Sequence, residues 1–179
     1  MRKTLIAIGA AAIATLSSSQ ATAQEDGELL ACFYECQQLT PRQNEVTNLV
    51  LVNPIQYGPG VFGSTATIVF FDGNQNLIAF SEVNLWEDDH AEIDVCQTLD
   101  AAGVSVPQNG LIEVGRERPA IYGWVKNFLV KTRGRGEVDS IEGIGKTECR
   151  LVPTAHKTNN ELRIQASDSG LDPVDPVFK

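Results

Sequence analysis

The chain has 179 residues, of which 42% are apolar and 21% charged, and its formal net charge is −9 at neutral pH. These values are those of a globular chain of one or two domains, and they exclude a disordered or collagen-like sequence. The acidic excess disfavours a nucleic-acid partner. After residue 23 there is no apolar run near the roughly 18 residues that a membrane helix needs, so no integral membrane segment is expected.

The N-terminus has the three parts of a secretory signal in the expected order. Arg2 and Lys3 precede an apolar run over residues 4–16, and a small-residue stretch ends in Ala-Thr-Ala at residues 21–23. This pattern predicts a signal peptide over residues 1–23, and therefore a periplasmic or secreted protein that begins at Gln24. Its removal leaves 12 basic and 23 acidic residues, a net charge of −11.

The mature chain has four cysteines: Cys32, Cys36, Cys96 and Cys149. An even number in an exported chain predicts two disulfides, with three possible connectivities. We expect Cys96 to pair with Cys149 and Cys32 to pair with Cys36. The second bridge requires residues 28–39 to be helical or looped, because an extended strand would hold the two cysteines roughly 13 Å apart.

Apolar and β-branched runs bounded by turn residues predict about eight short strands. In chain order, these strands are expected over residues 46–52, 65–71, 77–85, 91–95, 111–114, 121–132, 149–152 and 162–164. Asp72-Gly73-Asn74 predicts a hairpin turn, and residues 96–102 predict a short helix closed by Gly103. Residues 28–39 fit both a helical face and strand alternation. Glycines at 134, 136, 143 and 145 are expected to interrupt the chain.

The strands are not separated by helical segments of 10–15 residues, which argues against a parallel α/β sheet. The pattern predicts an all-β fold, an antiparallel sandwich of about eight strands with one short helix. We expect an N-terminal cysteine-containing segment over residues 24–45, the sandwich over 46–166 and a flexible acidic tail over 167–179.

A family resemblance rests on four short stretches: Asn48-Leu-Val-Leu-Val-Asn-Pro, Ile68-Val-Phe-Phe-Asp-Gly-Asn, Ile93-Asp-Val and Gly110-Leu-Ile-Glu-Val. In this order they resemble exported immunoglobulin-like β-sandwich modules, over about residues 46–115. The resemblance implies the sandwich fold and no functional residue. The Cys-Trp-Cys order of antibody domains is not matched cleanly, since a helical turn at Cys96 is not a strand.

Two stretches resemble metal-binding and nucleotide-binding motifs, but simpler interpretations account for both. Glu87-Asp88-Asp89-His90 is the best candidate for a hard cation, because carboxylate oxygens suit calcium. Adjacent carboxylates in a loop usually face water, so neither a metal site nor a cofactor is predicted. The stretch Gly143–Thr147 ends like a phosphate-binding loop, but Ser140 stands where that loop needs glycine.

Two alternatives concern the cysteines and the histidines. Cys32 and Cys36 have a spacing that could bind a soft metal such as copper, with His90 or His156 as a third ligand. A hydrolase would have to use one of these two histidines, and the sequence lacks the Gly-x-Ser-x-Gly elbow. We therefore predict a protein that is not an enzyme.

The sequence is best interpreted as an exported, disulfide-stabilised, non-catalytic binding or structural module with an unknown protein or glycan partner. Trp86 and Trp124 could each stack on a sugar or anchor a partner, and Trp124 is expected in the core. Two alternatives remain open: a small exported enzyme with a site near His90, and a surface-fibre subunit completed by a donated strand.

Overall fold

The computed structural model describes residues 28–54, 63–86, 88–116, 121–133, 137–153 and 159–179. The predicted signal peptide lies outside the described residues. The described residues form ten strands and two helices: β1 (Glu28–Glu35), β2 (Gln37–Thr40), β3 (Gln43–Asn53), β4 (Ser64–Asp72), β5 (Leu77–Leu85), β6 (Asp89–Asp94), α1 (Val95–Ala101), β7 (Asn109–Arg116), β8 (Tyr122–Thr132), β9 (Val138–Glu148), β10 (Arg150–Pro153) and α2 (Asn159–Asp168).

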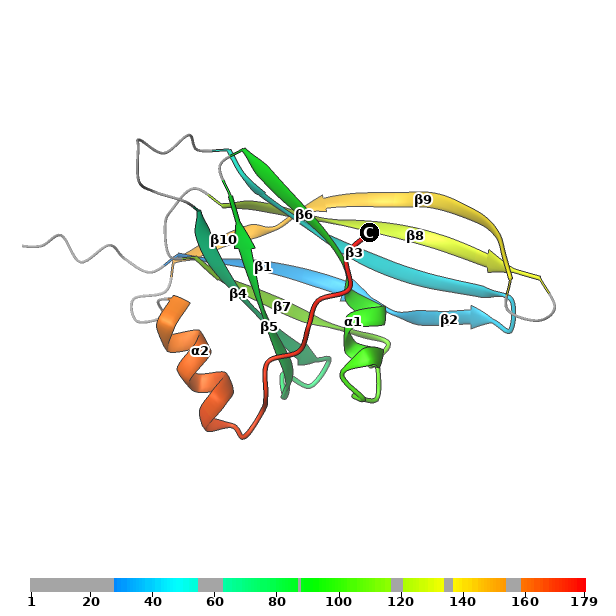
Figure 1. The fold of residues 1–179 in the computed structure, drawn as a ribbon. Helices are drawn as coiled ribbons and strands as arrows, with labels where there is room; N and C mark the ends of the chain where they lie inside the picture. Colours follow the sequence, from blue (N-terminus) through cyan, green and yellow to red (C-terminus); the bar gives the residue numbers. More distant parts are fainter. Residues whose placement is uncertain (1–27, 55–62, 87, 117–120, 134–136, 154–158) are drawn as a thin grey trace, which may run out of the picture.

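The strands form two antiparallel sheets (Figure 1). Sheet A has the order β10-β1-β7-β4-β5. Sheet B has the order β2-β3-β8-β9, and β6 also pairs with β3. The predicted all-β antiparallel sandwich is therefore confirmed, as is the short helix α1, which begins after its cap Asp94. Neither helix of the described residues is long and apolar enough to cross a membrane.

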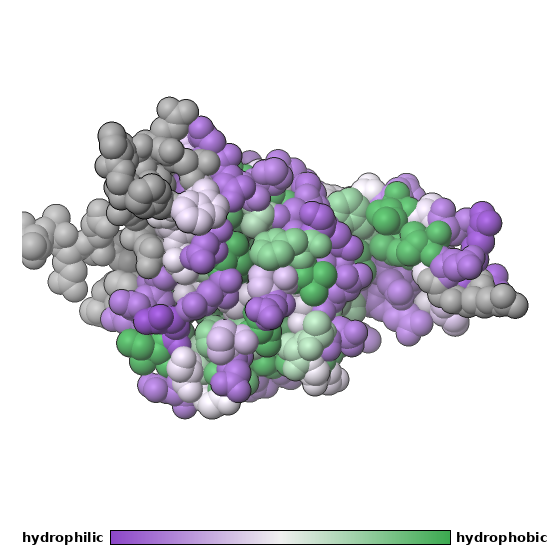
Figure 2. Space-filling view, in the orientation of Figure 1, coloured by the Kyte–Doolittle hydropathy of each residue, from purple (hydrophilic) through white to green (hydrophobic). Residues whose placement is uncertain are grey.

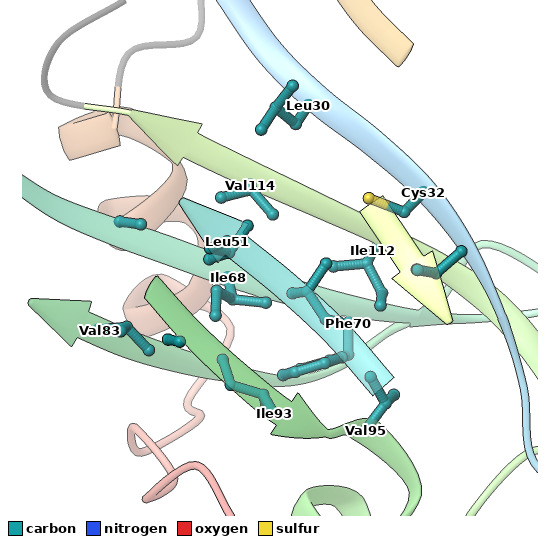
Figure 3. Close-up of a cluster of buried hydrophobic side chains, with 14 of the residues drawn as sticks. Leu30, Cys32, Leu51, Ile68, Phe70, Val83, Ile93, Val95, Ile112 and Val114 are labelled. Atoms are coloured by element: carbon teal, nitrogen blue, oxygen red, sulfur yellow. The ribbon is translucent and has the colours of Figure 1, made fainter. Parts of the chain in front are cut away.

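The main core lies between the two sheets, where alternate residues of β1 and of β3 to β8 point inward (Figure 3). Sheet A contributes Ile68, Phe70 and Ile112, and sheet B contributes Leu51 and Ile93, all without exposed surface. These residues belong to the apolar runs that predicted the strands. Burying them is the main term that stabilises the sandwich.

The N-terminal segment is extended, and it corrects the predicted disulfide pairing. β1 belongs to sheet A and β2 to sheet B, so the chain crosses between sheets at Cys36. Cys32 is bonded to Cys149, with Cα atoms 4.7 Å apart, and Cys36 is bonded to Cys96, with Cα atoms 5.6 Å apart. All four cysteines are disulfide-bonded, but both predicted pairs were wrong. An extended strand keeps Cys32 and Cys36 too far apart, so each pairs with a distant segment.

A second helix covers the outer face of sheet A. Residues 162–164 were predicted as a strand but lie within α2, because the apolar positions that pack inward, Leu162 and Ala166, are four apart as on a helix. They form a second apolar cluster with Val69 and Phe80 of sheet A. The part of sheet A under α2 is therefore buried on both faces, which explains the unbroken apolar run over residues 68–71 of β4.

The C-terminal segment, residues 171–179, joins the open edges of the two sheets and does not form a free tail. It runs from the end of α2 past β5 to β6 (Figure 1). The Val174 N–H donates to Phe80 O of β5, and Phe178 forms an antiparallel bridge with Ile93 of β6. The expected flexible tail is thus replaced by a segment that closes this side of the sandwich.

Sheet B extends past the ends of the sheet A strands as a single layer, which we call the arm (Figure 1). The arm consists of β2, residues 43–46 of β3, residues 128–132 of β8 and residues 138–144 of β9. Every residue of β9 is exposed. Gly143 and Gly145 were expected to interrupt the chain, but they lie inside β9, which is paired to β8 over its length with two bulges. Bulges let a strand include such residues and continue.

Candidate functional site

A groove between β5, β6 and the C-terminal segment brings together several residues that the sequence singled out. We call it the β5–β6 groove, and it has a volume of about 430 Å³. Its lining consists of Glu82, Val83, Asn84, Leu85, Trp86, Asp89, His90, Ala91, Glu92, Pro176, Phe178 and Lys179. A hollow of this size, with aromatic and polar lining, lies within the range of small-ligand sites.

Trp86 forms one wall of the groove and is held there by its backbone. The buried side chain of Asn53 donates through Nδ2 to Leu85 O at 3.2 Å and to Trp86 O at 3.0 Å. Gly63 lies against the Leu85 carbonyl and has a φ of +144°. A Cβ at position 63 would be 2.7 Å from Leu85 O. Only glycine accommodates both the conformation and this close approach. The Trp86 backbone is thus fixed, while 58% of the residue's surface stays exposed.

The turn that follows Trp86 carries the acidic run that was considered for a metal ion. Asp88 has a left-handed φ of +52°, a conformation that aspartate adopts in turns. Asp89 donates its N–H to Trp86 O at 3.3 Å and accepts the His90 N–H at Oδ1 at 2.8 Å. Asp89 and His90 both line the groove. The turn therefore brings a carboxylate and an imidazole to the groove that Trp86 also lines.

The opposite side of the groove comes from the C-terminal segment, which is held by several contacts. Val177 O accepts the Asp94 N–H at 2.8 Å, and the Val177 N–H donates to the Thr98 hydroxyl at 3.0 Å. Lys179 Nζ lies 2.7 Å from the buried carboxylate of Asp94. These contacts fix the backbone on both sides of Phe178, and 57% of the Phe178 surface is exposed.

Several polar side chains of the groove are already engaged with protein partners. Burial by itself raises the pKa of the Glu92 carboxyl, but the hydrogen bonds from Lys126 and Asn48 and the Lys126 charge outweigh burial and hold the pKa below its ordinary value. The Lys126 Nζ to Glu92 Oε2 distance is 2.6 Å. Glu82 lies 3.9 Å from Arg163. The groove is therefore polar, and its charged side chains Glu82, Glu92 and Lys179 each lie beside a side chain of opposite charge.

The predicted metal-ligand candidates do not assemble into a cluster in the described part of the chain. Glu87 and His156 lie outside the described residues. Asp88, Asp89 and His90 are described, and no group of three His, Cys, Asp or Glu side chains that could hold a metal ion occurs among the described residues. Cys32 and Cys36 are disulfide-bonded to other cysteines, so they are not a thiolate pair.

The other motifs have structural explanations. Asp72 accepts hydrogen bonds from the Asn74 and Asn76 N–H groups, each at 2.8 Å, which confirms the predicted hairpin turn. The phosphate-loop-like stretch lies within β9, and Lys146 Nζ sits 4.2 Å from the centroid of the Trp124 ring. Trp124 was expected in the core, but it pairs with Val50 on the outer face of sheet B.

A second hollow lies at the other end of sheet A and has a volume of about 410 Å³. It includes Phe33, which is 75% exposed, together with Asp72, Gln75 and Asn109. Its other aromatic residue, Tyr34, is fully buried. The β5–β6 groove is therefore the stronger candidate, because two exposed aromatic residues line it.

Comparisons with protein-family models, with curated proteins and with solved structures find no match for this chain. The class that the structure itself defines is an antiparallel β-sandwich with two disulfides.

Sequence reasoning found Trp86, Asp89 and His90 but missed Phe178. The segment around Phe178 has three Asp and two Pro within residues 167–179, a composition that indicates a free tail. The only signal available was the apolar spacing of Leu171, Val174 and Phe178, which is too irregular to predict a strand.

Proposed function

We propose that the protein is an exported, non-catalytic binding module that holds a neutral glycan chain in the β5–β6 groove. The observation that carries this proposal is the pair of exposed aromatic residues, Trp86 and Phe178, from two separate segments in one polar groove. An aromatic ring stacks on the apolar C–H face of a pyranose, while carboxylate, amide and imidazole groups bond its hydroxyls.

A neutral ligand fits the charges of the groove. Lys179 is paired with Asp94, and Lys126 is paired with Glu92, so both cations already have partners. An anionic sugar would have to compete with these carboxylates, whereas a hydroxyl can accept from His90 or donate to Asp89. Binding is favoured over catalysis because Glu82 and Glu92 are held by Arg163 and Lys126.

Export is supported by the signal-like N-terminus and by the two disulfides, which form and persist in oxidising compartments. Its test is the intact mass of the protein purified from its native compartment. Export predicts a chain that begins at Gln24, and a chain that retains Met1 would contradict it.

Glycan binding is tested by calorimetric titration of residues 24–179 with neutral hexasaccharides of glucose, mannose and N-acetylglucosamine. We expect one of them to bind, and Trp86→Ala to weaken its affinity at least tenfold, about 1.4 kcal/mol. Phe33→Ala is the matched control, since Phe33 is also an exposed aromatic residue but lies in the other hollow. Absence of binding at millimolar sugar, or unchanged affinity in Trp86→Ala, would refute the proposal.

The same samples distinguish the alternative functions. An enzyme with a site near His90 would release shorter oligosaccharides during incubation, which chromatography detects, and His90→Ala would abolish the release. A fibre subunit that took up a donated strand between β5 and β6 would have to displace residues 171–179, which bond both strands.

A further inference from the structure

The β5–β6 groove meets the outer face of sheet B at His90. Ala91 and Ile93 of β6 point into the core, so His90, which alternates with them, points to the outer face of the sheet. His90 is exposed and also lines the groove. One exposed side chain is therefore shared by the groove and by the sheet face beside it.

The strand register places Tyr122 in the same row as His90. Val52 of β3 pairs with His90 of β6 on one side and with Tyr122 of β8 on the other. Leu51, the neighbour of Val52, points into the core, so the row lies on the outer face. Tyr122 is 59% exposed, and Val52 is only partly buried. The row thus presents an imidazole and a phenol ring on either side of a small apolar side chain.

This row is longer than one sugar ring. Neighbouring strands lie about 4.8 Å apart, so the backbones at His90 and Tyr122, which are two strands apart, are separated by roughly 10 Å. A pyranose is about as large as the ring of a tyrosine side chain. A single sugar in the groove therefore does not reach Tyr122, whereas a chain of several sugars does.

Tyr122, in this row, is more accessible than Trp124 in the next one. Trp124 lies opposite Val50 and is partly buried. Lys146 Nζ lies 4.2 Å from the centroid of the Trp124 ring, so a cation already covers one face of the indole. Of these two aromatic residues, Tyr122 is therefore the one on which a sugar can stack.

The two rows next to this one, with Lys179 at the edge of β6, carry as many ammonium groups as carboxylates among the described residues. The ammonium groups belong to Lys126, Lys146 and Lys179, and the carboxylates belong to Glu92, Asp94 and Glu148. Lys126 Nζ lies 2.6 Å from Glu92 Oε2. Lys179 Nζ lies 2.7 Å from Asp94 Oδ2. This balance favours a neutral ligand over an anionic one.

We propose that the outer face of sheet B at Val52 and Tyr122 is a second subsite for the glycan chain that the β5–β6 groove binds, an inference that rests on the proposed glycan binding. The chain passes His90 and stacks a further sugar on the Tyr122 ring, so the protein selects long chains over short ones. The side of the molecule that carries β6 and the C-terminal segment mixes hydrophilic and hydrophobic side chains (Figure 2). Such a surface suits a ligand that has both hydroxyls and apolar C–H faces.

The test is calorimetric titration of residues 24–179 with glucose, mannose and N-acetylglucosamine oligosaccharides of two, four and six units. We expect the six-unit chain to bind about fivefold more tightly than the two-unit chain of the same sugar. Tyr122→Ala should remove this gain and leave the affinity for the two-unit chain unchanged, which also shows that the variant is folded. Tyr122→Phe keeps the ring and should keep the gain. Phe33→Ala is the matched control and should bind every length as the wild type does.

Two outcomes would overturn the second subsite and leave the groove in place. One is an affinity that does not depend on chain length. The other is a Tyr122→Ala variant that loses affinity equally for every length that binds, or for none. A protein that binds no sugar of any length would instead refute the groove itself, and the second subsite with it. Trp86→Ala separates the two sites, because it should weaken the binding of every length.

Discussion

At the residue scale, Gly110 lies at a crowded position between β1 and β4. A Cβ at this position would lie 2.0 Å from Phe71 O and 2.5 Å from the Tyr34 hydroxyl. That hydroxyl donates to Phe71 O at 3.1 Å. Burial, assisted by the Asp72 charge, raises the pKa of Tyr34 above its ordinary range, so the donor keeps its proton.

Gly110→Ala is therefore expected to lower the free energy of unfolding by about 3 kcal/mol, because the added methyl group collides with backbone and displaces a buried hydrogen bond. Gly145→Ala is the control, since a Cβ there meets nothing within 4 Å. It should change stability by less than about 0.5 kcal/mol. Urea unfolding measures both, and equal midpoints for the two variants would contradict the packing described here.

Glu92 gives the fold a dependence on pH. Because its pKa is lowered in the folded state, the ionised Glu92 carboxylate stabilises the fold. This stabilisation is complete at pH values above the unfolded-state pKa of about 4.3, and it is lost as pH falls through the lower folded-state pKa. Glu92→Gln should cost about 1 kcal/mol at pH 7, and the difference from wild type should shrink at pH 3.

Urea unfolding at the two pH values tests the role of Glu92. Glu142→Gln is the control, because the pair between Glu142 and Lys131 is longer, at 3.8 Å, and largely exposed. It should change stability by less than about 0.5 kcal/mol at both pH values. A Glu92→Gln difference that is the same at pH 7 and pH 3 would show that the carboxylate charge does not matter.

At the element scale, α2 is attached to sheet A through few side chains. The Asn159 side chain accepts the Thr67 N–H at 2.8 Å, and Leu162 packs on the sheet with 1% exposure. Leu162→Ala should lower the free energy of unfolding by about 3 kcal/mol, since it leaves a cavity under the helix.

Ile164→Ala is the matched control for α2, because Ile164 is 54% exposed on the same helix. It should change stability by less than about 0.5 kcal/mol. Chemical denaturation distinguishes the two variants. Similar losses for both would mean that α2 does not pack on sheet A through Leu162.

At the scale of the whole molecule, the two disulfides tie the N-terminal strands to distant parts of the chain. Cys32–Cys149 spans 117 residues and Cys36–Cys96 spans 60. The loop-entropy relation predicts that replacing either pair by serine lowers the free energy of unfolding by about 4 to 5 kcal/mol.

Peptide mapping under non-reducing conditions tests the connectivity directly. It should yield Cys32 linked to Cys149 and Cys36 linked to Cys96, and a Cys32–Cys36 peptide would contradict the extended β1. Urea unfolding of the two serine variants then measures each bridge. Because both loops are long, the two losses should differ by less than about 1 kcal/mol.

The local sequence determined the strands whose apolar pattern extends over several residues, such as β4, β5 and β8, as well as the Asp72 turn and the presence of the short helix α1. It also identified Trp86 and His90 as candidate binding residues. Each of these features depends on neighbours within a few positions, so pattern and turn chemistry are sufficient to predict it.

Only the tertiary structure decided the disulfide pairing, the place of residues 171–179 and the composition of the groove. Cys32 finds Cys149 because β10 pairs with β1, and Phe178 reaches the groove because its segment bonds β6. Cys32 and Cys149 are 117 positions apart, and Ile93 and Phe178 are 85 positions apart. Such contacts form only when the two sheets pack together, and the local pattern of any one segment does not encode that packing.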